Sequence, residues 1–405
     1  MDHRQSLADA WVADPVLARQ VRRVSDGRLA AGWELLERLV NVDSPPDHRA
    51  GQDEVVSIMD SAWGDLGFER SWRRTDAGMP VLDVQRRVGA EAPTILVLLH
   101  LDTVFPVGTV AERPFQVQDG KALGPGVADM KGGAVSAMLA VASALEVTGG
   151  LPHLNLRILN NTDEEAGSVQ SRPLIEEAGQ DADLALVFEP GRPDGSIVTQ
   201  RRGVRRFRLT VKGKPAHTGV EPWAGANANE ELAHKVIALH ALNDRDRFLS
   251  VTVSKMRGGA AINVIPEHAV AEVDARIPDL DTAEEVQRTV DTLASESVVA
   301  GTQTSYEIFA DRPPLVPHPS VEGLLGGMRG AAEALGVEFR VTATGGGSDG
   351  CFLGPMDVPV LDALGPVGGG YHTPEEFMWA DSLGERTALA GAFLAWLDAG
   401  LARRA

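Results

Sequence analysis

Short, mostly apolar runs recur along the chain, and each leads to residues that can carry chemistry. The runs, each with the polar residues that follow it, are 94–99 with His100, 154–159 with Asp163, Glu164 and Glu165, 184–188 with Glu189, and 358–364 with His372. Continuously apolar runs predict strands covered on both faces by helices. Residues 131–147, rich in alanine, methionine and leucine, predict a crossover helix between the first two strands. The ligand site of an open α/β sheet lies beyond the carboxyl ends of its strands, so we expect these side chains at one edge.

The middle of the chain has a different pattern. Residues 207–211 alternate apolar and polar positions, which predicts a half-exposed strand. The elements expected after it are a helix at 227–242, strands at 249–256 and 268–276, a helix at 281–300 and a strand at 302–310. The order βαββαβ is typical of a ferredoxin-like unit. We therefore expect an α/β protein with one domain of residues 1–203 and 314–405, and a second domain of residues 204–313 inserted into it.

Size and charge limit the classes of protein and partner. A chain of 405 residues exceeds the roughly 250–300 residues that share one hydrophobic core, which favours two domains. The formal net charge of −19 argues against a nucleic-acid partner, which would need a basic patch. The start of the chain lacks the apolar core of a signal peptide, and we expect no membrane span. Because Cys351 is the only cysteine, no intrachain disulfide can form, and we expect a cytoplasmic protein.

Histidine, aspartate and glutamate without cysteine suit a borderline metal such as zinc. In the run His100-Leu-Asp102, residues two apart face the same way, so Asp102 can accept the second ring N–H of His100. A buried histidine with a polar neighbour is the alternative. The glycine-rich loop 124–133 presents Asp129 just before a helix, where a plain helix-capping aspartate is the alternative.

The acidic run after the second strand is harder to explain without a cation. Adjacent carboxylates repel each other unless positive charge lies close by, although a solvated acidic turn is the alternative. One of Glu164 and Glu165 can bind a metal while the other reaches a metal-bound water. Glu189 follows the five apolar residues 184–188, and glutamate is rarely buried unpaired. His372 follows a glycine-rich loop that could bend closely around a site.

Five motifs, in the same order along the chain, resemble those of a zinc exopeptidase family. That family includes bacterial glutamate carboxypeptidase, acetylornithine deacetylase, succinyl-diaminopimelate desuccinylase and aminoacylase, and the chain looks closest to glutamate carboxypeptidase. The motifs are His100-Leu-Asp-Thr-Val104, Gly124-Pro-Gly-Val-Ala-Asp129-Met-Lys-Gly-Gly133, Asn161-Thr-Asp-Glu-Glu-Ala-Gly-Ser168, Phe188-Glu-Pro190 and Gly345-Gly-Gly-Ser-Asp349. The resemblance implies a mixed sheet flanked by helices, with the inserted ferredoxin-like unit serving as a lid and dimerisation domain.

The resemblance also implies two zinc ions per subunit, with cobalt or manganese as possible substitutes. Asp129 would bridge the two ions. His100 and Glu189 would complete one metal site, and Glu165 and His372 would complete the other. Glu164 would be the general base that activates a zinc-bridging water, and Asp102 would orient His100.

Residues of the inserted domain and the loop after it would bind the substrate. His217, in Lys212-Gly-Lys-Pro-Ala-His217, matches a lid motif whose histidine reaches the partner subunit's active site and supports the tetrahedral oxyanion. Asn263 and Arg276 match positions that hold the substrate's carboxylate, and Arg312 is expected to join them. The motif that starts at Gly345 adds Gly346 and Gly347 to this set.

We therefore expect a homodimer that hydrolyses an amide bond in a peptide or N-acyl amino acid with a free carboxylate. The acyl group stays open between pteroyl, acetyl, succinyl and aminoacyl. The run Gln200-Arg201-Arg202-Gly203 departs from the glutamate carboxypeptidase pattern, and residues 191–197 lack a lysine found there. Both departures concern the choice of substrate, and the roles of Arg201 and Arg202 stay open.

Other classes of site compete for the same residues. Ser348, Asp362 and His372 follow the order of a serine hydrolase triad around Gly346-Gly-Ser-Asp-Gly350, but that reading leaves the other acidic residues unexplained. A nucleotide loop through Gly345, Gly347 and Gly350 lacks the helix that should follow it, and Cys351 is expected to be packed rather than nucleophilic. A non-catalytic binding protein on the same scaffold would not need Glu164 and His217.

Overall fold

The computed structural model describes residues 7–404 and divides the chain into two compact units. The first unit contains the residues up to Gln200, Pro317–Ala343 and the residues from Ser348 onward, and the second contains Arg201–Val316 and Thr344–Gly347. The sequence prediction places residues 344–347 in the domain of residues 1–203 and 314–405, but in the structure they belong to the second unit. The reason is Arg201, whose Nη1 donates to the carbonyl oxygens of Gly346 and Gly347 at 3.1 Å each. Residues 1–6, on which the expectation of no signal peptide partly rests, lie outside the described residues.

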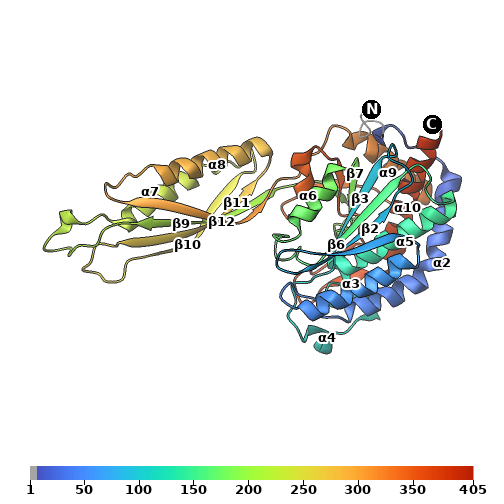
Figure 1. Ribbon diagram of the computed structural model, residues 1–405, viewed down its shortest axis with the longest axis horizontal. Helices are drawn as coiled ribbons and strands as arrows, with labels where there is room; N and C mark the ends of the chain where they lie inside the picture. The colour runs from blue at the N-terminus through green and yellow to red at the C-terminus, as the bar shows by residue number, and fades with distance from the viewer. Residues whose placement is uncertain (1–6, 405) are drawn as a thin grey trace. The chain divides into compact units, whose positions relative to one another are not determined.

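A six-stranded mixed sheet forms the centre of the first unit (Figure 1). In spatial order its strands are β1 (Glu69–Arg74), β2 (Pro80–Arg86), β6 (Asn155–Asn161), β3 (Thr94–His100), β7 (Leu184–Val187) and β14 (Val360–Leu361). β3 runs parallel to β6 and β7, and β14 runs parallel to β7, as the four apolar runs predict. The pattern does not predict β1 and β2, which extend the sheet in the antiparallel sense, and β1 is largely exposed with no apolar run to mark it.

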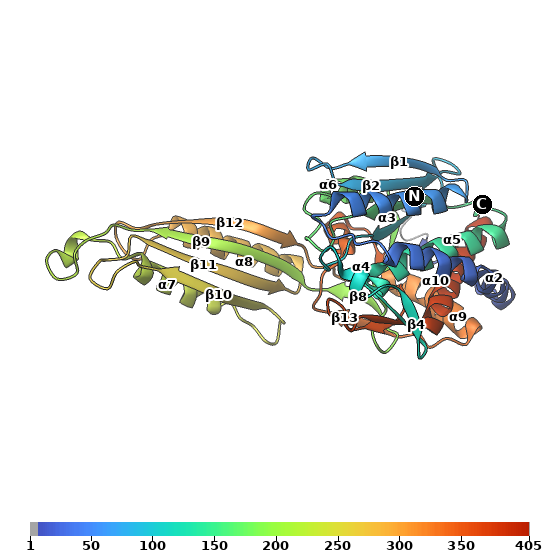
Figure 2. The ribbon, with the colours of Figure 1, turned by 90° about the horizontal axis from the view of Figure 1, so that it is seen from below.

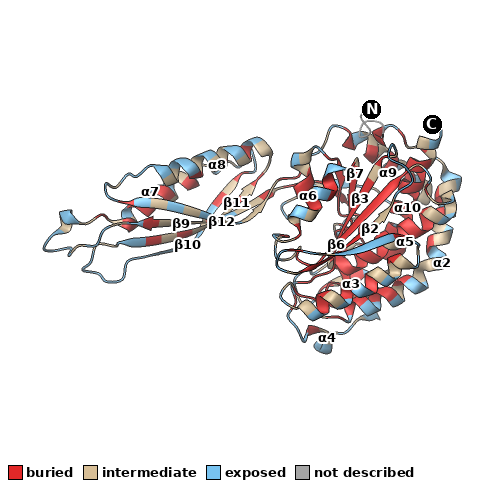
Figure 3. Cartoon of the chain, viewed as in Figure 1, coloured by how far each residue is buried: buried red, intermediate tan, exposed pale blue. Residues whose placement is uncertain are grey.

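Helices pack around this sheet, and their inner faces are buried (Figure 3). They are α2 (Pro15–Val40), α3 (Arg49–Gly64), α5 (Gly133–Thr148), α6 (Arg172–Gln180), α9 (Val321–Leu335) and α10 (Ala380–Ala402), and the single turn α4 (Thr109–Glu112) lies in a loop. α5 contacts β3, α3 contacts β1 and β2, and α2, α5 and α10 pack on one another. β3, β6 and β7 are buried along almost their whole length, which confirms an α/β fold with a mixed sheet and flanking helices.

α5 is the predicted crossover helix, and it begins two residues later than the sequence indicates. The preceding residues form a short π-helical turn, η1 (Val127–Gly132), in which Asp129 and Met130 have non-helical dihedral angles. Together the two segments, Val127–Thr148, are long and apolar enough to cross a membrane by length and composition alone. However, 78% of their most apolar window is buried inside the protein, as in the core helix of a globular domain.

Short elements complete the first unit and the boundaries between the units. A small sheet contains β4 (Gln116–Gln118), β5 (Lys121–Leu123), β16 (Phe377–Trp379) and β15 (Gly368–Gly369), in the spatial order β15-β16-β5-β4. The remaining elements are β8 (Ile197–Arg201), β13 (Val341–Thr344) and the 3₁₀ segment η3 (Asp349–Met356). The small sheet matters for the site, because η1 follows β5 and His372 lies between β15 and β16.

The second unit is a four-stranded antiparallel sheet with two helices on one face (Figure 2). Its elements in chain order are β9 (Gly203–Lys212), η2 (Pro222–Ala224), α7 (Ala228–His240), β10 (Ser250–Gly258), β11 (His268–Ile277), α8 (Leu280–Ser295) and β12 (Gln303–Arg312). The spatial order β10-β11-β9-β12 confirms the predicted ferredoxin-like unit.

α8 ends five residues before the predicted boundary at residue 300, and a buried ion pair explains the difference. Glu231 of α7 accepts hydrogen bonds from the backbone N–H groups of Val298 and Val299 at 2.9 and 2.7 Å. Lys235, one turn further along α7, pairs with Glu231 at 2.7 Å and donates to the carbonyl oxygen of Glu296. These contacts draw the chain out of the helix and onto α7, which a local helical pattern cannot reveal.

Candidate functional site

The carboxyl ends of the parallel strands bring most of the candidate residues together. His100 is the last residue of β3 and pairs with Asn161, the last residue of β6, while Glu189 follows β7 by two residues. Asp129 arrives from η1, and His372 arrives from the turn between β15 and β16. The convergence expected from the sequence is therefore present within the first unit.

His100 lies between three acidic residues. Its Nε2 lies 3.2 Å from Oδ1 of Asp129 and 3.7 Å from Oε1 of Glu189. Its Nδ1 lies 3.2 Å from the carbonyl oxygen of Asp102 and 3.4 Å from Oδ1 of the same residue. Asp102 therefore faces His100, as its spacing of two residues predicts, and its carbonyl oxygen is the nearer of the two acceptors.

The carboxylate of Asp102 also holds the acidic run after β6. It accepts hydrogen bonds from the backbone N–H groups of Glu164 at 3.2 Å and of Glu165 at 2.9 Å. Asp102 is fully buried, so these two N–H groups, rather than water, solvate its negative charge. One carboxylate thus fixes the backbone from which Glu164 and Glu165 project.

His372 completes a second group on the other side of Asp129. Its Nε2 lies 3.2 Å from Oε2 of Glu165 and 3.4 Å from Oδ2 of Asp129. Asp129 thus presents one carboxylate oxygen to His100 and the other to His372. This division is the geometry expected of a carboxylate shared between two cations.

The donor set fits metal ions such as zinc in both chemistry and spacing. Two ligand atoms about 2.0–2.1 Å from a tetrahedral zinc lie about 3.3 Å apart, close to the contacts that His100 and His372 make here. Ligand atoms lie within 4.8 Å of one another in two groups, His100 with Glu164 and Glu189, and His100 with Asp129 and Glu165. The first group includes Glu164, for which the resemblance implies the role of base rather than ligand, so its role needs a test.

The ionisation of the cluster reflects its excess of carboxylates. Burial lowers the pKa of His100, but its contacts with Asp102 and Asp129 raise it well above the ordinary value. Hydrogen bonds that His372 donates to Asp129 and then to Glu165 raise its pKa to about 10. Burial raises the pKa of Glu165 to about 7, although His372 opposes the shift. A bound cation would supply the positive charge that protons on these groups otherwise provide.

Glu376 belongs to the site but escapes sequence reasoning. It is 1% exposed, and its carboxylate accepts hydrogen bonds from the backbone N–H groups of Gly126, Ala128 and Asp129. Burial raises its pKa to about 7. The available signal is an acidic pair three and four residues after His372, but nothing in the sequence separates Glu376 from its exposed neighbour Glu375.

The candidate substrate residues lie in the second unit, in two separate places. Backbone contacts bring the segments of His217 and Asn263 together, since the N–H of Thr218 donates to the carbonyl oxygen of Asn263 at 3.1 Å. Arg276 of β11 and Arg312 of β12 both lie opposite Val204 of β9, one on each side.

Arg276 and the glycine pair have contacts of their own within the second unit. Arg276 donates to both carboxylate oxygens of Asp274, at 2.7 and 3.2 Å. Gly346 and Gly347 are held by Arg201, which is buried, whereas Arg202 stacks over the ring of Phe248 at 5.4 Å. Arg201 thus shapes the glycine turn expected at the substrate.

The geometry contradicts the serine hydrolase alternative. The hydroxyl of Ser348 donates directly to Asp362 at 2.5 Å, and both residues are fully buried. His372 faces Asp129 and Glu165 instead, so no histidine stands between the serine and the aspartate. Cys351 is also buried, as expected of a packed residue.

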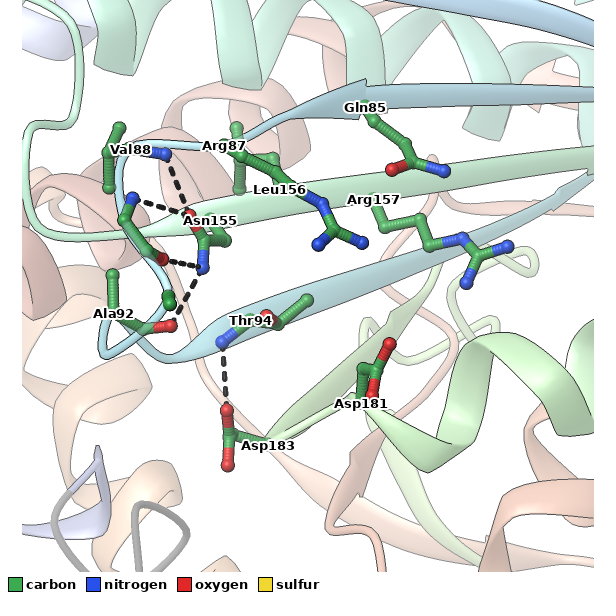
Figure 4. A pocket seen from close by; sticks show the side chains of 12 residues that line it. Gln85, Arg87, Val88, Ala92, Thr94, Asn155, Leu156, Arg157, Asp181 and Asp183 are labelled. Atoms are coloured by element: carbon green, nitrogen blue, oxygen red, sulfur yellow. Dashed lines mark hydrogen bonds between the residues drawn. The ribbon is translucent and has the colours of Figure 1, made fainter.

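A cavity of about 630 Å³ lies at the other ends of the same strands (Figure 4). Thr94, the first residue of β3, and Asn155, the first residue of β6, line this cavity. Asn155 also accepts a hydrogen bond from the N–H of Val88, another lining residue, at 2.8 Å. His100 lies six residues further along β3, a separation of about 20 Å at 3.3 Å per residue. The cavity is therefore distinct from the candidate metal site.

Comparisons with known proteins agree with this geometry. The model of peptidase family M20/M25/M40 matches residues 96–395. The chain is 29% identical over 406 residues to carboxypeptidase G2 of Pseudomonas sp. (strain RS-16), which covers 97% of each protein. It is 29% identical over 369 residues to succinyl-diaminopimelate desuccinylase of Delftia acidovorans, covering 85% of this chain and 92% of that protein. The solved structure of aminopeptidase PepT from Bacillus cereus shares the fold, with a TM-score of 0.72, 24% identity and coverage of 92% and 98%.

Gly133 tests how closely α5 must approach the end of β7. A Cβ atom at Gly133 would lie 1.9 Å from the carbonyl oxygen of Phe188, the residue before Glu189. We expect Gly133→Ala to displace Glu189 and to weaken metal binding about 10-fold or more, as when groups that orient metal ligands are lost. Titration with zinc measures the effect. Gly27→Ala is the matched helical control, because a Cβ there meets nothing within 4 Å, and equal metal affinity in both variants would contradict the prediction.

Proposed function

We propose that this chain, which belongs to peptidase family M20/M25/M40, uses the metal-dependent amide hydrolysis of that family to cleave a peptide or N-acyl amino acid that carries a free carboxylate. The observation that carries the proposal is the division of the Asp129 carboxylate between His100 and His372. The similarity to carboxypeptidase G2 and to succinyl-diaminopimelate desuccinylase supports an amide substrate with an acidic end.

The donor set would hold two zinc ions in each subunit, and Asp129 would contribute a ligand oxygen to each. His100 and Glu189 would hold one ion, and Glu165 and His372 would hold the other. When bound, the metals would polarise the scissile carbonyl and lower the pKa of water at the site. The roles of the remaining groups follow from the chain itself.

Glu164 is the proposed general base. Its backbone is fixed by Asp102, and its neighbour Glu165 faces His372, so the two adjacent side chains serve different purposes. Glu164 accepts a proton from the attacking water as the C–O bond forms, and it passes that proton to the amine as the C–N bond breaks. The products are a carboxylic acid and a free amine, so the proton count balances.

His217 is suited to stabilise the oxyanion that forms on the carbonyl oxygen. Its Nδ1 accepts hydrogen bonds from the backbone N–H groups of Gly219 and Val220 at 3.1 and 3.2 Å. With Nδ1 occupied as an acceptor, the neutral ring carries its proton on Nε2, and the residue is exposed. His217 therefore presents an N–H donor to solvent or to a ligand, a role typically worth about 100–1000-fold in rate.

The two groups of substrate residues favour a site shared between subunits. Asn263 precedes β11 and Arg276 lies near its end, and the strand between His268 and Arg276 spans about 26 Å at roughly 3.3 Å per residue. A small substrate cannot contact both ends of one strand. We therefore propose a homodimer in which His217 and Asn263 act on the partner subunit's substrate, while Arg276 and Arg312 bind the substrate of their own subunit.

Glu164→Gln tests the assignment of the base. We expect turnover to fall by about 100-fold to 10,000-fold, because the proton acceptor is lost, while the metal content per chain stays the same. Steady-state rates and elemental analysis measure both quantities. Glu165→Gln is the control, for which we expect loss of metal as well as of activity. Near-normal turnover in Glu164→Gln would refute the assignment of Glu164 as the base. Loss of metal in that variant would instead identify Glu164 as a metal ligand, which its grouping with His100 and Glu189 permits.

Paired N-acyl amino acids and their C-terminal amides test the substrate class. We expect kcat/KM to be lower for the amides than for the acids by about 10-fold or more. The reason is that the amides lose a charge-assisted hydrogen bond to the carboxylate. Arg276→Gln should narrow this difference, and Arg288→Gln, on the exposed face of α8, should not. Equal hydrolysis of acids and amides would exclude carboxylate recognition. No hydrolysis with zinc, cobalt or manganese would favour a non-catalytic binding protein.

Mixed dimers test the sharing of the site between subunits. Glu164→Gln and His217→Ala are each expected to be nearly inactive, but a hybrid of the two would contain one site with both residues intact. We expect activity to return on mixing, up to about half that of the wild type in each hybrid dimer. The unmixed variants at the same total concentration are the control, and no recovery despite demonstrated subunit exchange would argue for sites within one chain.

A further inference from the structure

Glu376 occupies a place that neither metal binding nor proton transfer explains. Oε1 accepts hydrogen bonds from the N–H groups of Ala128 at 2.9 Å and of Asp129 at 3.0 Å, and Oε2 accepts one from Gly126 at 2.9 Å. Both oxygens therefore point into the backbone of the loop that carries Asp129. The buried carboxylate therefore satisfies the backbone N–H groups of that loop.

The loop needs such an acceptor because it cannot satisfy these N–H groups itself. Gly126 has a positive φ of 73°, and Asp129 has dihedral angles of −110° and 94°, which break the helical pattern of hydrogen bonds. A Cβ at Gly126 would lie 2.5 Å from Cγ2 of Thr103, so the loop is also closely packed. Successive N–H groups that point into one concavity form a binding place for an anion, and here the anion is a side chain.

The carboxylate of Glu376 is also linked to His372, because the two residues lie in one short segment of the chain. His372 lies in the turn between β15 and β16, and Glu376 directly precedes β16. Backbone hydrogen bonds hold the turn, among them those from the N–H of Thr373 to the carbonyl oxygen of Gly370 at 3.0 Å and from the N–H of Glu376 to the carbonyl oxygen of Thr373 at 3.2 Å. Movement of Glu376 therefore moves the segment that presents His372.

We propose that Glu376 is a positioning residue that holds the Asp129 loop against the His372 turn, and so sets the spacing between the two halves of the metal site. The proposal rests on the proposed metal site for its functional consequence, but not for its structural one. The carboxylate of Glu376 accepts its hydrogen bonds from backbone N–H groups, so it acts through the backbone of Asp129. Pairing of β16 with β5, Phe377 opposite Leu123, brings the two segments side by side, and Glu376 fixes their ends.

A carboxylate is required here, and an amide of the same size is a poor substitute. Three N–H donors face two oxygens, and glutamine replaces one of those oxygens with an NH₂ group, which is itself a donor. Glu376→Gln therefore sets donor against donor inside a buried loop. Glu376→Asp keeps the charge but shortens the side chain by one methylene, so it cannot reach all three donors in the same way.

Amide hydrogen exchange of the full-length protein tests the structural part without metal or activity. We expect exchange in residues 126–129 to be at least about 10-fold faster in Glu376→Gln than in the wild type, with intermediate exchange in Glu376→Asp. Glu375→Gln is the matched control, since that neighbour is exposed, and it should leave exchange unchanged. Unchanged exchange in β9 and β11 of the second unit would show that the effect is local and not general unfolding.

Zinc titration of the same variants tests the functional part. We expect Glu376→Gln to weaken zinc binding by about 10–100-fold, the range typical of lost groups that orient metal ligands, and to lower kcat more than it raises KM. Exchange and zinc affinity equal to those of Glu375→Gln would overturn the proposal. A third outcome is faster exchange in Glu376→Gln together with a wild-type protein that binds no zinc. That result would keep Glu376 as a positioning residue of the loop and would refute the proposed metal site instead. If Glu376→Gln does not fold, the same comparisons with Glu376→Asp decide.

Discussion

The concentration of buried negative charge around Asp129 is the constraint on which the rest of the site depends. Asp129, Glu164, Glu165 and Glu189 converge beside the imidazoles of His100 and His372, and like charges this close are tolerated only where cations or protons balance them. The shifted pKa values of His372 and Glu165 report that balance within the protein. A site that suits cations so well is costly to assemble, so the surrounding fold must hold its parts in place.

The fold meets this demand with one device used twice. Asp102 and Glu376 are buried carboxylates that accept backbone N–H groups, Asp102 from Glu164 and Glu165 and Glu376 from the loop of Asp129. Each places a negative charge behind a segment whose own side chain faces the candidate metal site. Main-chain hydrogen bonds to a charged acceptor are short and directional, so they fix a loop more firmly than apolar packing would.

Much of this arrangement could be predicted, because parallel strands leave strong local signals. Apolar runs mark β3, β6 and β7, and the residues that follow them, His100 and Glu189 among them, must meet at one edge. The βαββαβ order of the second unit is equally local. β1 could not be predicted, because it is a largely exposed edge strand without an apolar run. The end of α8 and the membership of residues 344–347 could not be predicted either, because each depends on a contact with a distant segment.

By itself, the sequence determined which chemical groups the site contains and which strands deliver them, since residue type and hydrophobic pattern are local properties. Only the tertiary structure decided which oxygen of Asp129 faces which histidine, that Ser348 donates to Asp362 rather than to a histidine, and that Glu376 rather than Glu375 turns inward. The physical reason is that contacts between separate segments, such as the hydrogen bond of Glu376 with the N–H of Asp129, select among side chains of equal local preference. The adjacent Glu375 and Glu376 are indistinguishable in the sequence. In the folded turn the side chain of Glu376 is buried and that of Glu375 is exposed.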